Sequence, residues 1–142
     1  MKKFTFLFSA ILLTAALNAQ TWKKEQLMPT AELAQVLTTT VTPKPLVFNV
    51  GPMDNIKSAK FIGRGTSVTA VEKLKGELNW ENKNRTIVVY CGCCSLSSCP
   101  NIRPIYDALL AQGFKNAKVL EIPEGIKPDW VAKGYPMEEE SK

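Results

Sequence analysis

All four cysteines of this 142-residue chain lie within nine residues, from Cys91 to Cys99. They directly follow the short apolar run 86–90, whose β-branched residues predict a central strand buried on both faces. Apolar residues then recur at helical spacing over 101–112, and Gly113 stands where such a helix would end. Open α/β sheets bind their ligands in loops between a strand end and a helix start. The sequence therefore predicts the functional site in this loop.

Cys91 is the first residue after the predicted strand, and we expect it to be the reactive group. Backbone amides around its sulfur and the positive end of the helix dipole would lower its pKa and make the thiolate a nucleophile. The chain contains no histidine, so a Cys–His catalytic pair is excluded. The candidate substrate-binding residues are Gly92, Cys93, Cys94 and Ser95, through their amides, and Arg103 as a cation.

The other cysteines leave two alternatives open. Cys91 and Cys94 have the Cys-x-x-Cys spacing of redox-active pairs. Four thiolates can also close a tetrahedral metal site, although this spacing matches no common zinc pattern. The candidate resolving thiols or metal ligands are Cys93, Cys94 and Cys99. We expect no cofactor other than a metal on this cluster.

The N-terminal residues 1–19 have the features of a secretory signal peptide. Lys2 and Lys3 precede an apolar run over 4–17, and Ala19 is a small residue suited to the cleavage site. We therefore expect a periplasmic or secreted protein. No second apolar run is long enough to span a bilayer, and the lysines form no basic stripe. The sequence thus predicts neither a membrane span nor a nucleic-acid partner.

The remaining chain fits one domain over 20–137 and a disordered polar tail over 138–142. Further buried strands are predicted at 45–50 and 117–122, and a lead-in or edge strand at 20–27. Helices are predicted at 31–37, 68–78 and 128–133, and an irregular segment at 56–65. Strands alternating with helices predict an α/β fold with a central, mostly parallel sheet covered by helices on both faces.

Several residues have predicted places in this fold. Residues 49–55 follow a predicted strand end, so we expect them to line the same crevice as the cysteine loop. The helix at 68–78 should face the core with Val68, Val71, Leu74 and Leu78. We expect the three tryptophans, Trp22, Trp80 and Trp130, to pack in the core or at its rim.

The pattern also resembles rhodanese-like domains. The resemblance covers most of the domain, is strongest over 87–136, and rests on Val88-Val89-Tyr90-Cys91, Leu109-Leu110-Ala111-Gln112-Gly113-Phe114, Val119-Leu120, Trp130 and Gly134-Tyr135-Pro136. It implies a small α/β domain in which Cys91 carries a persulfide. The implied activity is sulfur transfer from a small donor to a thiophilic acceptor, either a small thiol or a protein.

The chain also differs from that family around the site. Asn49, Val50, Gly51 and Pro52 stand where rhodaneses usually have an Asp and an Arg, and the cysteine loop is longer than usual. This loop has no basic residue before Arg103, which argues against thiosulfate as the donor. The alternatives are a non-catalytic module that binds Cu or Zn and a dithiol redox protein, both on the same scaffold.

Overall fold

The structure, a computed structural model, describes residues 21–139. Five parallel strands form one sheet in the order β1-β5-β4-β2-β3. Their bounds are Leu27–Pro29 (β1), Leu46–Asn49 (β2), Ala59–Phe61 (β3), Ile87–Tyr90 (β4) and Ala117–Glu121 (β5). The predicted α/β class with a central parallel sheet is confirmed. The predicted signal peptide lies outside the described residues.

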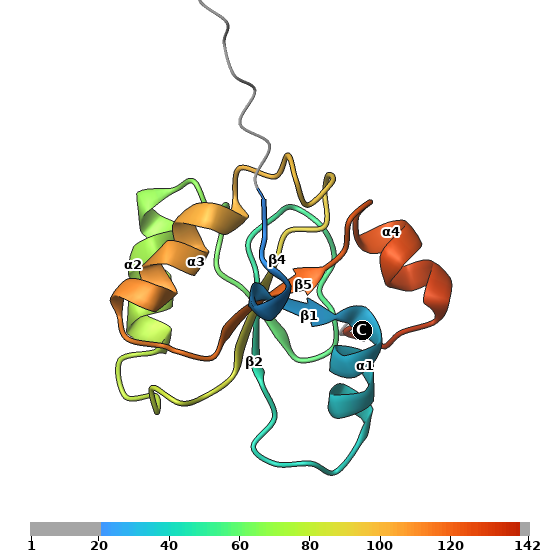
Figure 1. Ribbon diagram of the computed structural model, residues 1–142, viewed down its shortest axis with the longest axis horizontal. Coiled ribbons are helices and arrows are strands. Elements are labelled where there is room, and N and C mark those ends of the chain that lie inside the picture. The colour runs from blue at the N-terminus through green and yellow to red at the C-terminus, as the bar shows by residue number, and fades with distance from the viewer. Residues whose placement is uncertain (1–20, 140–142) are drawn as a thin grey trace, which may run out of the picture.

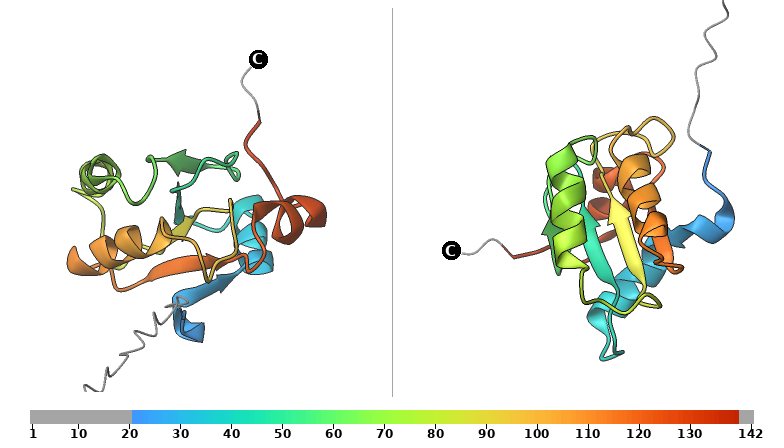
Figure 2. Two further views of the ribbon diagram at one scale, coloured as in Figure 1. Left: turned by 90° about the horizontal axis from the view of Figure 1, so that it is seen from above. Right: turned by 90° about the vertical axis from the view of Figure 1, so that its left-hand side faces the viewer.

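Helices cover both faces of the sheet (Figure 1). On one face, α2 (Val68–Glu77) and α3 (Ile102–Ala111) lie side by side, as Figure 2 also shows. On the other face lie α1 (Thr30–Thr38) and the short α4 (Ile126–Asp129). Two 3-10 turns, η1 (Lys24–Gln26) and η2 (Val131–Lys133), complete the elements. The sheet therefore separates two hydrophobic cores, one under each pair of helices.

The alternation of side chains along the central strand β4 determines the face of the sheet on which Cys91 lies. All four residues of β4 are fully buried, as the apolar run predicts. Successive side chains of a strand point to opposite faces. Ile87 and Val89 thus join the core under α2 and α3, whereas Val88 and Tyr90 join the core under α1 and α4. Cys91 continues the first series and belongs to the core beside α3.

The irregular segment predicted for 56–65 is partly wrong, because it contains the edge strand β3. An edge strand is hard to recognise in the sequence when neither face is fully covered, and Phe61 remains 47% exposed. The terminal helix is also shorter than predicted. It begins at Ile126 and gives way to η2, since Trp130 leaves helical geometry at φ −129°.

Two predicted core positions are wrong. Trp80 is 94% exposed, because it lies in the turn after α2 where no element covers it. Val68 begins α2 and is 77% exposed. The helix instead faces the core with Ala70, Leu74 and Leu78, all fully buried and four residues apart. Trp130, by contrast, is fully buried as predicted.

Glu138, the first residue of the predicted tail, is hydrogen-bonded to the loop between β2 and β3. The Glu138 amide donates a hydrogen bond to the Asn55 carbonyl at 2.9 Å. Its carboxylate accepts one from the amide of Ser58 at 2.6 Å. The chain end is thereby attached to the loop between β2 and β3. Residues 140–142 lie outside the described residues.

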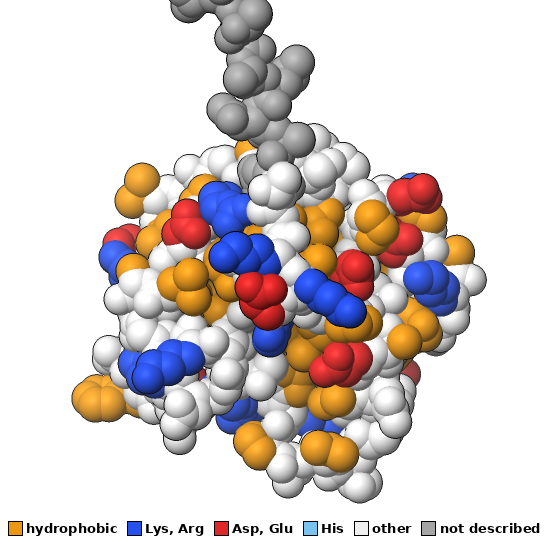
Figure 3. Space-filling model, in the orientation of Figure 1, with side chains coloured by type: hydrophobic (Ala, Val, Ile, Leu, Met, Phe, Trp, Pro, Cys, Tyr) orange, Lys and Arg blue, Asp and Glu red, His pale blue; other side chains and the backbone are white. Residues whose placement is uncertain are grey.

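Basic and acidic side chains alternate over the face shown in Figure 3. Every helix within residues 21–139 is too short or too polar to cross a bilayer.

Candidate functional site

Cys91 follows β4 at the carboxyl edge of the sheet, and its side chain is fully buried. The loop after it, residues 92–100, leads into α3. Asn101 is the N-cap residue of α3, so the sulfur lies at the positive end of a ten-residue helix. The predicted position of the site, between a buried strand and a helix start, is the position that the structure gives to Cys91.

Several donors surround the Cys91 sulfur. The Asn101 side-chain amide donates to it at 3.5 Å, and the Cys93 sulfur lies 3.1 Å away. The thiol of Cys99 and the backbone amide of Cys93 also hydrogen-bond to it. The Asn101 carboxamide is oriented by Thr66, whose hydroxyl donates to its oxygen at 3.4 Å. The amide nitrogen therefore faces the sulfur. This arrangement favours a thiolate over a thiol at Cys91.

The titration of the three thiols follows from these contacts. The hydrogen bond from Cys99 is the main cause that lowers the pKa of Cys91 to about 5, against the opposing effect of burial. Partial loss of hydration, together with donation to the Cys91 and Cys94 sulfurs, raises the pKa of Cys93 to about 12, although the side chain remains exposed to solvent. Donation to Cys91 raises the pKa of Cys99 as well. The cluster therefore holds one negative charge at neutral pH, and that charge resides on Cys91.

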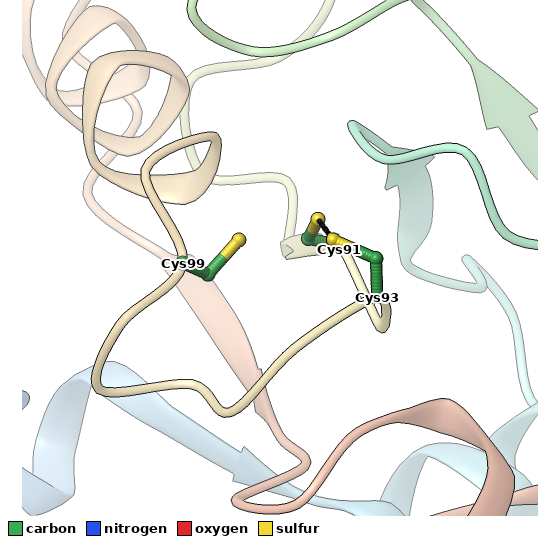
Figure 4. A group of neighbouring side chains, drawn as sticks. All are labelled: Cys91, Cys93 and Cys99. Carbon is green, nitrogen blue, oxygen red and sulfur yellow. Dashed lines mark hydrogen bonds between the residues drawn. The ribbon is translucent and has the colours of Figure 1, made fainter.

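The sulfur atoms of Cys91, Cys93 and Cys99 lie within 4.8 Å of one another, close enough to hold a metal ion. Figure 4 shows the Cys93 and Cys99 side chains directed toward Cys91 from two points of the loop. Cys94 contacts Cys93 at 3.6 Å. None of the four cysteines, all in the described part of the chain, forms a disulfide.

Two glycines allow the backbone to approach this cluster. A Cβ atom on Gly51 would lie 2.4 Å from the Cys91 sulfur and 2.6 Å from its carbonyl oxygen. Gly92 has a φ of +75°, and a Cβ atom there would lie 2.7 Å from that of Ile126. The Gly92 carbonyl accepts a hydrogen bond from the Ile126 amide at 3.0 Å, which fixes the start of the cysteine loop against α4. Both positions exclude a side chain for steric reasons.

A pocket of about 290 Å³ opens beside the cysteine cluster. Its lining comes from the end of β2, the following loop and β3, namely Asn49, Gly51, Pro52, Met53, Asp54, Asn55 and Phe61. Gly51 both lines this pocket and contacts Cys91. Gly51 thus brings the predicted segment 49–55 into contact with Cys91, but no residue of the cysteine loop is among the described residues that line this pocket.

Hydrogen bonds fix the loop that lines the pocket. The Asn49 amide donates to the Met53 carbonyl at 2.7 Å, and its side-chain oxygen accepts from the Gly51 amide at 3.0 Å. From the opposite core, the buried Tyr90 hydroxyl accepts from the Ile56 amide at 2.9 Å. Burial raises the pKa of Tyr90, so this hydroxyl stays neutral.

Other predicted site residues have different contacts. The Ser95 hydroxyl lies 2.6 Å from that of Ser98, so it supports the loop. The Arg103 guanidinium lies 3.7 Å from the centre of the Trp22 ring and donates to the Thr21 carbonyl at 3.2 Å. It is thus engaged with the N-terminal segment. Among the described residues, the backbone amide that reaches the Cys91 sulfur is that of Cys93.

Asn101 and Thr66 are site residues that were not predicted from the sequence. Asn101 is among the few buried polar residues, at 8% exposed, and its position at the helix start gave a weak signal. Thr66 lies far away in the sequence, and no local pattern connects it with the cysteine loop. The contact between these two residues depends on how α2 and α3 pack together.

Comparison with models of protein families and with curated proteins found no match for this chain. What the fold and the site define is therefore a class: a small α/β protein with a parallel sheet and a cysteine cluster at the carboxyl edge of its central strand.

Proposed function

We propose that this protein is an exported sulfurtransferase of the rhodanese-like type, in which Cys91 carries sulfur as a persulfide. The observation that supports this most is the Cys91 sulfur itself, which is held as a thiolate by donors from Cys99, Cys93 and Asn101. A thiolate at a strand end, facing a helix N-terminus, is an activated sulfur nucleophile. The sequence resemblance over 87–136 agrees with this reaction class.

The reaction consists of two displacements at sulfur. The Cys91 thiolate attacks the outer sulfur of a donor, a bond forms between the two sulfurs, and the donor group leaves with the electron pair of its broken bond. A thiophilic acceptor then attacks the outer sulfur of the Cys91 persulfide. The bond to Cys91 breaks, and the electron pair returns to Cys91 as a thiolate. A thiol with a low pKa is a good leaving group in this second step.

Within the described residues, the groups that donate to the Cys91 sulfur include no lysine or arginine. The nearby Arg103 is engaged with Trp22 and Thr21. A dianion such as thiosulfate would therefore reach Cys91 without a cation to offset its charge. The persulfide of cysteine carries a smaller net charge and suits this site better.

The test is to load the purified protein with cysteine persulfide and to measure thiocyanate formed with cyanide. The intact mass should gain one sulfur that cyanide removes. Cys91→Ser should abolish both signals, and Ser97→Ala, an exposed change in the same loop, should keep both. Full activity in Cys91→Ser would show that the assignment is wrong.

The sulfur geometry favours one second candidate, a soft-metal site made by Cys91, Cys93 and Cys99. A metal at about 2.3 Å from three thiolates requires sulfurs about 4 Å apart. The present separations, 3.1 Å for Cys91 to Cys93 and at most 4.8 Å elsewhere, need only small adjustments. Cu(I) suits three soft ligands best. Native mass spectrometry after incubation with Cu(I) or Zn(II) tests this, and metal-free protein would refute it.

The redox alternative is less well supported by the contacts. The sulfur in contact with Cys91 is that of Cys93, whereas Cys94 contacts Cys93. A redox pair of Cys91 and Cys94 predicts loss of two hydrogens from the intact mass after oxidation, with both residues in one cross-linked peptide.

A further inference from the structure

Two cysteines in contact differ completely in exposure. Cys91 is fully buried, whereas Cys93 is exposed to solvent. Their sulfur atoms lie 3.1 Å apart, closer than the 3.6 Å between the sulfurs of Cys93 and Cys94. The side chains of Cys91 and Cys93 point toward each other in Figure 4. Cys93 therefore connects a buried sulfur with the protein surface.

The other sides of Cys91 are closed by protein. Cys99 is 1% exposed and Asn101 is 8% exposed, and both hydrogen-bond to the Cys91 sulfur. The backbone of Gly51 closes a third side. A small donor would reach Cys91 past Cys93, once the exposed Cys93 side chain rotates about its Cα–Cβ bond and moves its sulfur aside. The thiol of a folded protein is attached to a bulky backbone and reaches Cys93 first.

We propose that Cys93 is the exit thiol of a two-step relay: it takes the outer sulfur from a Cys91 persulfide and presents it to the thiol of an acceptor protein. This inference rests on the proposed function, because it needs sulfur on Cys91. It adds a residue and a class of acceptor, a protein thiol, to that reaction.

The relay step balances without an added reactant. The proton of the Cys93 thiol moves to the charged outer sulfur of the persulfide. The Cys93 sulfur forms a bond to that outer sulfur, and the bond between the outer sulfur and Cys91 breaks. Its electron pair stays on Cys91, which becomes a thiolate again. The formal oxidation of the Cys93 sulfur is matched by the reduction of the Cys91 sulfur, so the step has no net redox change, and the cluster keeps a single negative charge.

The local chemistry favours transfer in this direction. Thiol exchange is faster when the leaving sulfur is well stabilised as a thiolate, and the Cys91 sulfur is the leaving group of the relay. The Asn101 amide lies 3.5 Å from that sulfur, and the Cys99 thiol and the Cys93 backbone amide also donate to it. The donors around Cys91 that stabilise its thiolate also stabilise it as the product of the relay. From Cys93, a protein thiolate can remove the sulfur at the surface.

The same contact allows a competing reaction. Cys93 can attack the inner sulfur, that of Cys91, to form a Cys91–Cys93 disulfide and expel the outer sulfur as sulfide. Such a disulfide requires the two sulfurs to close from 3.1 Å to about 2.05 Å across a single intervening residue. The relay requires no such ring, because the transferred sulfur bridges the gap.

The experiment compares two acceptors of different size. Wild-type protein and the Cys93→Ser, Cys94→Ser and Ser97→Ala variants are each loaded with cysteine persulfide and freed of excess donor. One portion receives cyanide, and the other receives a reduced single-cysteine thioredoxin, whose gain of one sulfur is followed by mass spectrometry. Peptide mapping of alkylated protein locates the sulfur before an acceptor is added.

Wild-type protein should show sulfur on both Cys91 and Cys93. Cys93→Ser should load one sulfur on Cys91 and still react with cyanide, but deliver it to thioredoxin at least ~tenfold more slowly. Ser97→Ala, which also replaces an exposed side chain of the loop, should match wild type in both reactions.

Other results would overturn the relay. The first is that Cys93→Ser delivers sulfur to thioredoxin at the wild-type rate. The second is that Cys94→Ser loses this delivery while Cys93→Ser retains it. The third is that Cys93→Ser takes up no sulfur from the donor. Sulfide release with a Cys91–Cys93 disulfide in wild-type protein would do the same. If wild-type protein takes up no sulfur at all, the proposed function itself fails and the relay fails with it.

Discussion

Removing the Cys99 thiol should raise the pKa of Cys91. The hydrogen bond from Cys99 is the largest cause that lowers the pKa of Cys91 to about 5, and burial opposes it. Cys99→Ala removes the donor and leaves the burial. We expect the pKa of Cys91 to rise by at least ~1 unit toward its ordinary value of about 8.5. Cys99→Ser keeps a hydroxyl donor and should shift it less.

The size of this effect determines which assay is informative. A thiol with a pKa of about 5 is about 99% ionised at pH 7, and one with a pKa of about 8.5 is about 3% ionised. The thiolate with the higher pKa is, however, intrinsically about 25- to 55-fold more nucleophilic. The two effects nearly cancel, so an alkylation rate at pH 7 would hide the change. The midpoint of the titration must be measured instead.

The assay is the ultraviolet absorbance of the thiolate between pH 3.5 and 8.5, a range chosen around the expected midpoint at about 5. Wild-type protein should ionise one thiol with that midpoint, and Cys91→Ser should lose this step. The step should move upward in Cys99→Ala and less in Cys99→Ser. An unmoved midpoint in Cys99→Ala, or a step that persists in Cys91→Ser, would refute the assignment of the charge.

Three further predictions concern stability. Because the folded-state pKa of Cys91 is lowered to about 5, ionisation of this thiol stabilises the folded protein at pH 8.5. This stabilisation is lost as the pH falls through about 5, where the free energy of unfolding should change by at most ~1.4 kcal/mol per pH unit. Urea unfolding of Cys91→Ser should show a weaker dependence on pH in that window. Gly51→Ala places a Cβ atom 2.4 Å from the Cys91 sulfur and should cost ~1–3 kcal/mol in urea unfolding. Gly76→Ala, within α2 with nothing in reach of its Cβ atom, should instead stabilise by ~0.5–1 kcal/mol, and an equal effect of both would contradict the packing argument. Tyr90→Phe leaves the Ile56 amide without its buried acceptor and should lower the free energy of unfolding by ~1–3 kcal/mol, whereas an unchanged thermal midpoint would mean that this bond is replaced.

The sequence by itself determined the scaffold of the site. The apolar run at 86–90, the four cysteines and the helical spacing after 101 are neighbours in the chain, and such local patterns largely decide strand, loop and helix. The pleat of β4 follows from the same run, so the face toward which Cys91 points was fixed locally. Prediction of the fold class required only the observation that strands and helices alternate along the chain.

Tertiary structure decided which groups meet at the sulfur. Gly51 comes from another strand end, and its contact with Cys91 exists because β2 and β4 are neighbours in the sheet. Thr66 orients Asn101 because α2 packs beside α3. Within the loop, spacing suggested Cys94 as the partner of Cys91, but the fold places Cys93 and Cys99 there. Contacts between segments distant in the chain depend on packing that no local pattern encodes, and the same reason explains why Trp80 is exposed.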